Sequence, residues 1–165
     1  MTGPDKNGNH GEEPEVSYYD KLAERTAELL EEGRKTLDEA LKKAKEELSK
    51  AGEFTSEQAD RAAEWVMRDV RQSAEMAARA VRQAVEPHRV AAGAQSLLAR
   101  ILTGTADTLN DLAQKAEQGL EFKTGEVTSA GSLTCKDCGA EMHMKQTARI
   151  PPCAKCHETV FRKSY

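Results

Sequence analysis

Apolar residues recur at helical spacing through the first part of the chain, with Glu and Lys filling many of the positions between them. Between residues 17 and 50 the spacings are three, four, and seven or eight positions, which places one apolar stripe along a helix. The stripe consists of Leu22, Leu30, Leu37, Leu41, Ala44 and Leu48. The pattern therefore predicts one continuous helix of about 48 Å, at a rise of about 1.5 Å per residue.

A second helix is predicted to begin near Thr55 and to run to about residue 86. Gly52 suits the end of the first helix, and Thr55 with Gln58 forms a candidate capping box for the second. Because the connection is short, the two helices should form a long antiparallel hairpin. Trp65 is predicted to anchor the hairpin core, with an interface as the alternative. The second stripe consists of Ala62, Val66, Val70, Ala74 (or Ser73), Ala77, Val81 and Ala84.

A third apolar stripe follows Pro87, which either ends the second helix or begins the third. Its spacing alternates between four and three, which is typical of a coiled-coil seam. Gly119 is predicted to end this helix. The stripe consists of Leu98, Leu102, Thr105, Leu109, Leu112 and Ala116.

The pattern changes after Phe122, where short stretches of Thr, Ser, Gly and Val replace the helix-forming residues. Strands are predicted at 126–128, 132–134, 141–146 and 159–162. About forty residues cannot build a self-sufficient hydrophobic core, so a further interaction must hold this segment. Residues 1–16 show no periodicity and are expected to be a disordered tail.

Composition separates the helical part from the segment that follows it. Aromatic residues make up 4% of the chain and charged residues 32%, which favours long helices with thin, alanine-lined seams. The net charge of −4 divides into −7 for residues 1–121 and +3 for residues 122–165. No run of about 18 apolar residues occurs, so no membrane insertion is expected. Residues 1–16 do not resemble a signal peptide, and we expect a cytoplasmic protein, in which cysteines favour metal over disulfides.

The four cysteines form two C-x₂-C pairs, Cys135 with Cys138 and Cys153 with Cys156, separated by 14 residues. This spacing is typical of a four-thiolate zinc site, which leaves no open position and is therefore structural. The residue after each pair, Gly139 or His157, should adopt a positive φ angle. We predict one structural Zn²⁺ bound by these cysteines.

The resulting fold class is mainly α: a long antiparallel helical hairpin plus a third helix, followed by a small β zinc-ribbon module. The predicted boundaries are a tail over 1–16, a coiled-coil-like helical domain over 17–121 and a zinc ribbon over 122–165. The two modules are expected to be stabilised separately, so that the substitution Cys138→Ser should unfold the ribbon and leave the helices intact.

Three other uses of the cysteines compete with zinc binding. Residues 153–157 match the c-type haem attachment pattern C-x-x-C-H, but that reading leaves the first cysteine pair unexplained. Iron in a rubredoxin-type or iron–sulfur site uses the same ligands. A redox C-x-x-C motif expects a strand-to-helix context that the pattern lacks. His143 lies between the pairs and is interpreted as a surface residue.

The basic residues of the ribbon have two interpretations. One is nucleic-acid binding through phosphate contacts, with Lys145, Arg149, Arg162 and Lys163 as the first candidates. Alternatively, they offset the net charge of −2 on a four-thiolate zinc site, as Lys136 and Lys155 inside the knuckles suggest. A separate group on the second helix is expected to form a solvated, salt-bridged face or a seam to another helix. That group consists of Arg68, Arg71, Arg79 and Arg82.

Several short motifs resemble the bacterial YbeL-like proteins, helical chains with a C-terminal zinc ribbon. The motifs are Tyr18-Tyr19, Gly52-Glu53-Phe54-Thr55, Thr124-Gly125-Glu126-Val127, Leu133 to Cys138, Pro152 to Cys156, and Phe161 with Lys163. The similarity covers residues 18–163 and is most specific in the ribbon. The glycine that often follows the second cysteine pair is His157 here. The resemblance implies a zinc-binding cytoplasmic protein and does not imply an activity.

No Ser/His/Asp set, paired-carboxylate signal or phosphate-binding loop appears in the sequence, so we expect a protein that is not an enzyme. The main hypothesis is a cytoplasmic adaptor or regulatory protein that contacts protein partners through its helices and its ribbon. The exposed seams also favour a homodimer. The alternative is a nucleic-acid-binding protein that acts through the mildly basic ribbon.

Overall fold

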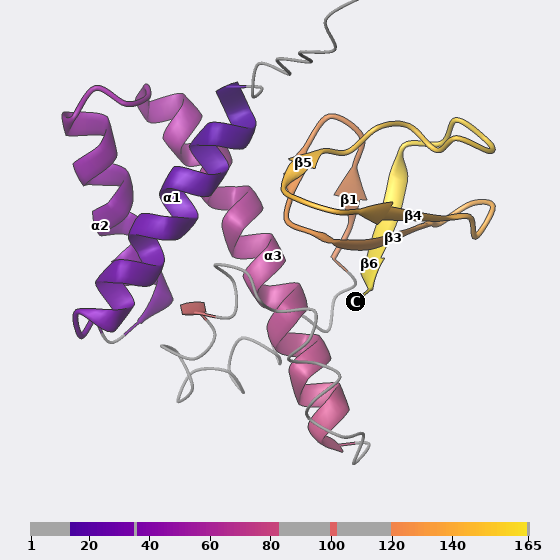
Figure 1. Ribbon diagram of the computed structural model, residues 1–165, viewed down its shortest axis with the longest axis horizontal. Coiled ribbons are helices and arrows are strands. Elements are labelled where there is room, and N and C mark those ends of the chain that lie inside the picture. Colours follow the sequence, from indigo (N-terminus) through magenta and orange to yellow (C-terminus); the bar gives the residue numbers. More distant parts are fainter. Residues whose placement is uncertain (1–13, 35, 83–99, 102–119, 165) are drawn as a thin grey trace, which may run out of the picture.

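The computed structural model describes residues 14–34, 36–82, 100–101 and 120–164 (Figure 1). Three helices, α1 (Pro14–Glu31), α2 (Leu37–Lys50) and α3 (Ser56–Arg82), precede a region of short antiparallel strands. This arrangement confirms the predicted fold class of a mainly helical N-terminal part followed by a small β module. Helix α1 begins at Pro14, slightly earlier than expected.

The single helix predicted over 17–50 is wrong, because the chain breaks after Glu31. Gly33 adopts φ 106, its N–H donates to Leu30 O (3.1 Å), and the N–H of Arg34 donates to Leu29 O (3.0 Å). These bonds form a Schellman motif, which satisfies the last carbonyls of α1. Thr36 then begins α2 by accepting a hydrogen bond from the N–H of Glu39 (3.3 Å). Helix α2 consequently folds back against α1.

The predicted turn into the next helix is confirmed. Gly52 adopts φ 76 at the end of α2, and its N–H donates to Ser49 O. The capping box is reciprocal: the N–H of Thr55 donates to Gln58 Oε1 (2.8 Å), and the N–H of Gln58 donates to Thr55 Oγ1 (3.3 Å). Helices α2 and α3 are therefore antiparallel neighbours, as the hairpin prediction requires.

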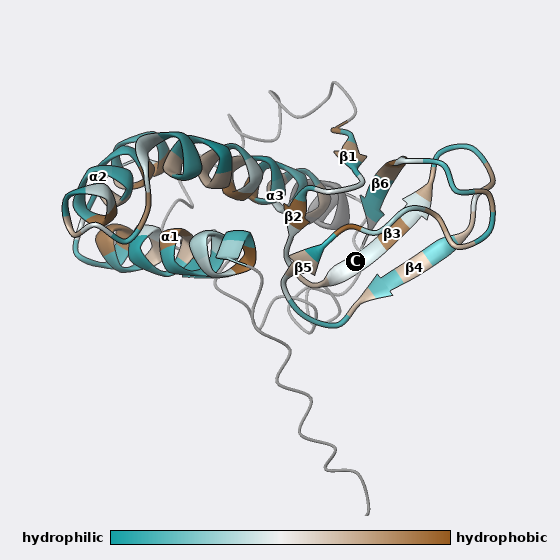
Figure 2. Ribbon diagram, turned by 90° about the horizontal axis from the view of Figure 1, so that it is seen from above, coloured by the Kyte–Doolittle hydropathy of each residue, from teal (hydrophilic) through white to brown (hydrophobic). Residues whose placement is uncertain are grey.

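The predicted apolar stripes meet in one helical core. The first four members of the second stripe are buried, with Ala74 and not the half-buried Ser73 in the core, and all members of the first stripe are buried except the half-buried Leu48. Trp65 packs in this core, which confirms its predicted role. Figure 2 shows apolar and hydrophilic positions alternating along all three helices. The core residues in these stripes are Leu22, Leu30, Leu37, Leu41, Ala44, Ala62, Val66, Val70 and Ala74.

The ribbon contains two small antiparallel sheets. The four-stranded sheet has the order β1-β6-β3-β4, and β2 pairs with β5. All four predicted strands are present, whereas β1 and β5 were not expected. The strands are β1 (Phe122–Lys123), β2 (Val127–Thr128), β3 (Gly131–Cys135), β4 (Glu141–Met144), β5 (Ala148–Arg149) and β6 (Val160–Ser164).

The ribbon packs directly against the helices. Strand β2 contacts both α1 and α3, and β2 and β5 lie on the side of the ribbon that faces the helices (Figures 1 and 2). Val127 of β2 belongs to the helical core, and Arg68 of α3 reaches Glu126 and the carbonyl of Val127. These shared buried contacts argue against separately stabilised modules, although the helices and the ribbon each also have a core of their own.

Several predictions concern residues outside the described part of the chain. These are the tail up to residue 13, the fate of the chain at Pro87, and all six members of the third stripe, within whose span only Arg100 and Ile101 are described. Both of these residues are helical; Ile101 is buried in the helical core, and Arg100 forms a two-bond ion pair with Glu31. Among the described residues, no helix combines the length and apolar character needed to cross a bilayer.

Candidate metal centre

The two cysteine pairs converge on one point. The Sγ atoms of Cys135 and Cys156 lie 3.6 Å apart, as do those of Cys138 and Cys153, and all four sulfurs lie within 4.8 Å of one another. Sulfurs that bind one Zn²⁺ tetrahedrally at about 2.3 Å are separated by about 3.8 Å. The observed cluster therefore fits a single tetrahedral metal ion, and it consists of the four cysteines expected from the sequence.

The backbone of the two pairs follows the same path twice. The N–H of Gly139 donates to Cys135 O (3.1 Å), and the N–H of His157 donates to Cys153 O (2.9 Å). Gly139 has φ 68 and His157 has φ 63, which confirms the positive angles predicted at both positions. These tight turns aim both sulfurs of each pair at the same point.

Backbone N–H groups also act on the sulfurs. Hydrogen bonds from the N–H groups of Cys156 and Lys155 lower the pKa of Cys153 to about 6. For Cys156, a hydrogen bond from the N–H of Glu158 favours the thiolate, but burial and the neighbouring sulfurs outweigh it and raise the pKa to about 12. One sulfur thus ionises readily, and a further thiolate beside it requires a compensating positive charge. A divalent cation supplies that charge.

The chemistry of the donor set indicates a structural role for the metal. Four thiolate donors complete a tetrahedron and leave no open position for water or substrate. Cys153 and Cys156 turn toward the first pair, which is the arrangement of a shared metal site and not of haem attachment. His143 is exposed and hydrogen-bonds to Ser132 Oγ (2.8 Å), in agreement with its interpretation as a surface residue.

The basic residues of the ribbon do not all face solvent. Lys136 is exposed and forms an ion pair with Glu121 at 2.7 Å, and Arg149 pairs with Glu15 of α1. Lys163 is completely buried, so it cannot contact nucleic acid as predicted. Arg68 is also largely buried, and its guanidinium lies 4.1 Å from the centre of the Phe122 ring, so it does not belong to a solvated face.

A buried polar cluster, which we name the Asp69 cluster, joins α1 and α3 to the ribbon. Asp69 Oδ2 accepts hydrogen bonds from Tyr19 Oη (2.8 Å), Thr128 Oγ1 (2.9 Å) and the N–H of Ser129 (2.7 Å). Lys163 Nζ lies 3.3 Å from the same oxygen. Lys163 Nζ also donates to Thr128 Oγ1 (2.8 Å), to Ser129 O (2.9 Å) and to Ser129 Oγ (2.6 Å).

The protonation states of this cluster follow from its surroundings. Burial alone would raise the pKa of Asp69, but Lys163, Arg68 and the hydrogen bonds from Ser129 and Tyr19 hold it below its usual value. Burial lowers the pKa of Lys163 to about 8, although Asp69 acts in the opposite direction. The cluster therefore contains an ionised carboxylate next to a buried amine.

Sequence reasoning missed the Asp69 cluster, although signals for it were present. Asp69 lies three positions after Val66 and one before Val70, so helical periodicity places it on the buried face. Lys163 lies two positions after Phe161 in β6, so the alternation of a strand places both side chains on the same face. A charged residue on each apolar face was the signal for a buried pair.

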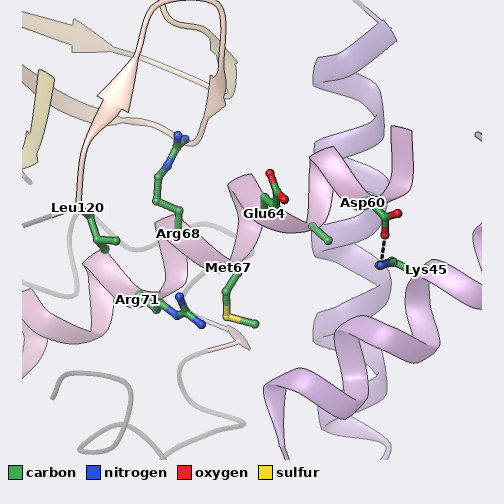
Figure 3. A pocket seen from close by; sticks show the side chains of 8 residues that line it. Lys45, Asp60, Glu64, Met67, Arg68, Arg71 and Leu120 are labelled. Carbon is green, nitrogen blue, oxygen red and sulfur yellow. Dashed lines mark hydrogen bonds and ion pairs between the residues drawn. The ribbon is translucent and has the colours of Figure 1, made fainter. Parts of the chain in front are cut away.

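One groove lies on the helical side of the contact between the helices and the ribbon (Figure 3). It has a volume of about 590 Å³, and an ion pair between Lys45 and Asp60 lies in its wall. The side chain of Arg68 points out of the groove toward the ribbon, as Figure 3 shows. The groove is lined by Lys45, Asp60, Ala63, Glu64, Met67, Arg68, Arg71 and Leu120.

Comparison with known proteins agrees with this geometry. Residues 24–164 match a family described as a zinc-ribbon containing domain, so the match extends from α1 through β6 and spans most of the chain. No curated protein and no solved structure matches the chain. The second part of α1, all of α2 and α3, and the cysteine cluster lie inside the matched range. The chain belongs to this family of zinc-ribbon proteins.

Proposed function

We propose that the protein is a non-enzymatic, cytoplasmic zinc-binding adaptor, in which a structural Zn²⁺ holds the ribbon in place for contacts with partner proteins. The observation that carries this proposal is the closed cluster of four sulfurs within 4.8 Å on a ribbon joined to the helices by buried contacts. A metal bound by four cysteines stabilises a fold and leaves no position for a substrate. Because buried contacts join the helices to the ribbon, each part offers its own surface to partner proteins, and the two surfaces keep a fixed position relative to each other.

The metal is tested first. Purified protein should contain one zinc per chain by elemental analysis, and the substitution Cys138→Ser should lower the zinc content and the zinc affinity strongly. Ser132→Ala is a matched control, because Ser132 lies in the same sheet but is not part of the sulfur cluster. Iron in place of zinc, or full zinc binding by Cys138→Ser, would contradict the proposed site.

The adaptor role is tested by capture of partners. Tagged protein is recovered from cytosol with and without nuclease, beside the Cys138→Ser variant. We expect at least one protein partner that survives nuclease and that depends on the ribbon. Recovery of the same proteins by wild type and Cys138→Ser would show that the ribbon does not contribute. A monomer without partners would contradict the adaptor role.

A second candidate function is nucleic-acid binding by the ribbon. The observation that favours it is the exposure of Lys123, Lys145 and Arg162, all on the ribbon. Binding through phosphates should weaken steeply with salt, and Lys145→Ala with Arg162→Ala should weaken it further. Lys42→Ala with Arg61→Ala is the matched control, because both residues are exposed on the helices. If retention on nucleic acid does not fall as the salt concentration rises, this function is contradicted.

Two finer assignments also belong to this proposal. The motifs of the ribbon support membership of the bacterial YbeL-like group within the zinc-ribbon family. A homodimer would have to form through surfaces other than the described apolar stripes, because these stripes are largely buried within one chain. Light scattering of the zinc-loaded protein measures the number of chains directly.

A further inference from the structure

The Asp69 cluster takes its residues from both parts of the molecule. Asp69 belongs to α3 and Tyr19 to α1, whereas Thr128, Ser129 and Lys163 belong to the ribbon. The side chains of Asp69 and Lys163 are both completely buried. The contact between the helices and the ribbon is therefore centred on one carboxylate that accepts hydrogen bonds from both sides.

The two charges of this cluster depend on each other. A buried charge without its partner is strongly unfavourable, whereas a well-bonded pair is tolerated. The helices alone provide Asp69 with Tyr19 and the neighbouring Arg68, and the remaining bonds come from the ribbon. Loss of the ribbon would thus remove most of the groups that stabilise the carboxylate.

Lys163 lies on a strand that pairs with a strand carrying a cysteine of the sulfur cluster. Strands β3 and β6 are paired with Leu133 opposite Lys163 and Cys135 opposite Phe161. Only one pair of facing residues, Thr134 with Arg162, thus lies between Lys163 and a cysteine of the metal site. A segment this small needs the metal to remain folded, so the position of Lys163 depends on the metal.

We propose that binding of the metal by the ribbon controls how well helices α1 and α3 are ordered, and that Asp69 couples the metal site to these helices. This inference rests on the proposed structural metal and adds a regulatory consequence to it. When the metal leaves, the ribbon releases Asp69, and the contact surface of α1 and α3 opens to solvent. Helices α1 and α3 then respond to metal availability although the four cysteines of the sulfur cluster all lie in the ribbon.

Coupling of this kind is reciprocal. If metal binding shifts the equilibrium toward ordered helices by a given factor, the contact with the ordered helices must raise the metal affinity by the same factor. A substitution at Asp69 should therefore weaken metal binding from a distance. A residue that merely stabilises the helices, with no contact to the ribbon, should not have this effect.

The experiment uses the full chain and zinc with a competing chelator. Hydrogen exchange is followed for the amides of α1 and α3, and fluorescence is followed at Trp65, the only tryptophan of the chain. We expect zinc removal to raise exchange in both helices and to change the fluorescence. We also expect Asp69→Asn to weaken zinc binding about 10-fold, within the usual range of coupling between sites.

Two controls separate coupling from loss of stability. Asp60→Asn removes an exposed carboxylate of the same helix and should bind zinc like wild type. Ala40→Gly destabilises α2 in the helical core and should leave zinc affinity unchanged. If Asp69→Asn does not fold, Tyr19→Phe removes one hydrogen bond to Asp69 and keeps the ring, and zinc affinity should fall by about two- to fivefold.

The outcomes distinguish the two proposals. If the protein binds one zinc but α1 and α3 exchange equally with and without it, the coupling is overturned and the structural metal stands. Wild-type zinc affinity in both Asp69→Asn and Tyr19→Phe would also overturn the coupling. A wild-type chain that binds no zinc would overturn the proposed function and the coupling together.

Discussion

His157 and Gly139 occupy equivalent backbone positions, yet only one of them is a glycine. Both adopt a positive φ angle after a cysteine pair. A residue with a Cβ atom in this region costs roughly 1–2 kcal/mol, whereas glycine adopts it freely. His157 is exposed, and its positive φ angle places backbone strain in the turn after the second pair.

This difference predicts opposite effects for a matched pair of substitutions. Gly139→Ala should destabilise the ribbon by about 1 kcal/mol, because a Cβ atom there meets open space and only the backbone is strained. His157→Gly should stabilise it by a similar amount. Zinc affinity measured by competition reports both changes. Equal affinities for the two variants would contradict the interpretation of the turns.

The buried amine of Lys163 makes the stability of the protein depend on pH. Its pKa of about 8 in the folded protein lies below 10.5, the ordinary value expected in the unfolded chain, so the folded state releases the proton first. The unfolded state then binds more protons between pH 8 and 10.5, and the free energy of unfolding rises with pH in this window. Wild type should gain stability relative to Lys163→Met as the pH rises. If the difference in the free energy of unfolding between wild type and Lys163→Met stays constant over this pH window, the shifted pKa of Lys163 is contradicted.

Sequence reasoning was most successful at the two cysteine pairs, whose spacing restricts the arrangement of the four side chains. The cysteine spacing identified all four members of the sulfur cluster, and the φ angles at Gly139 and His157 followed from the turn geometry. It failed for Lys163, because a lysine in a basic segment looks like a surface residue. Only the strand alternation that places it beside Phe161 distinguishes it.

At the scale of the elements, the break between α1 and α2 shows how a stripe can mislead. Leu30 and Leu37 are seven positions apart, which suits one helix and equally suits two helices that pack together. The signals for the break were Gly33 and the sequence from Thr36 to Glu39, which has the form of a capping box. The stripe was identified correctly, but local capping decides whether it lies on one helix.

Substitutions at this break should confirm its role. Gly33→Ala should cost about 1–2 kcal/mol, because φ 106 is strained for any residue with a Cβ atom. Thr36→Ala should cost about 1 kcal/mol through loss of the helix cap. Thermal unfolding monitored by circular dichroism measures both. If Gly33→Ala were as stable as wild type, the break would not require glycine at this positive φ angle.

At the scale of the whole molecule, the Asp69 cluster makes the helices and the ribbon depend on each other. Sequence patterns predicted both parts but could not predict the joint, because it is formed by residues far apart in the chain. Asp69 and Lys163 are separated by 94 positions. Periodicity places each on a face, whereas only the packed structure shows that the two faces meet.

A double-mutant cycle tests this joint. Lys163→Met alone should cost about 3 kcal/mol or more, because it leaves the buried Asp69 carboxylate without its cation. Asp69→Asn combined with Lys163→Met should cost less than the sum of the two single changes. Urea unfolding of the zinc-loaded protein provides the free energies. Additive effects would show that the two charges do not interact.

The alternation of burial among the four cysteines gives the metal centre an inner and an outer side. Cys135 and Cys153 are buried, whereas Cys138 and Cys156 are half-buried. A competing thiol or chelator therefore reaches the outer sulfurs first, while the inner pair still holds the ion. The speed at which the protein exchanges its metal is then governed by two ligands, although all four determine how tightly the metal is bound.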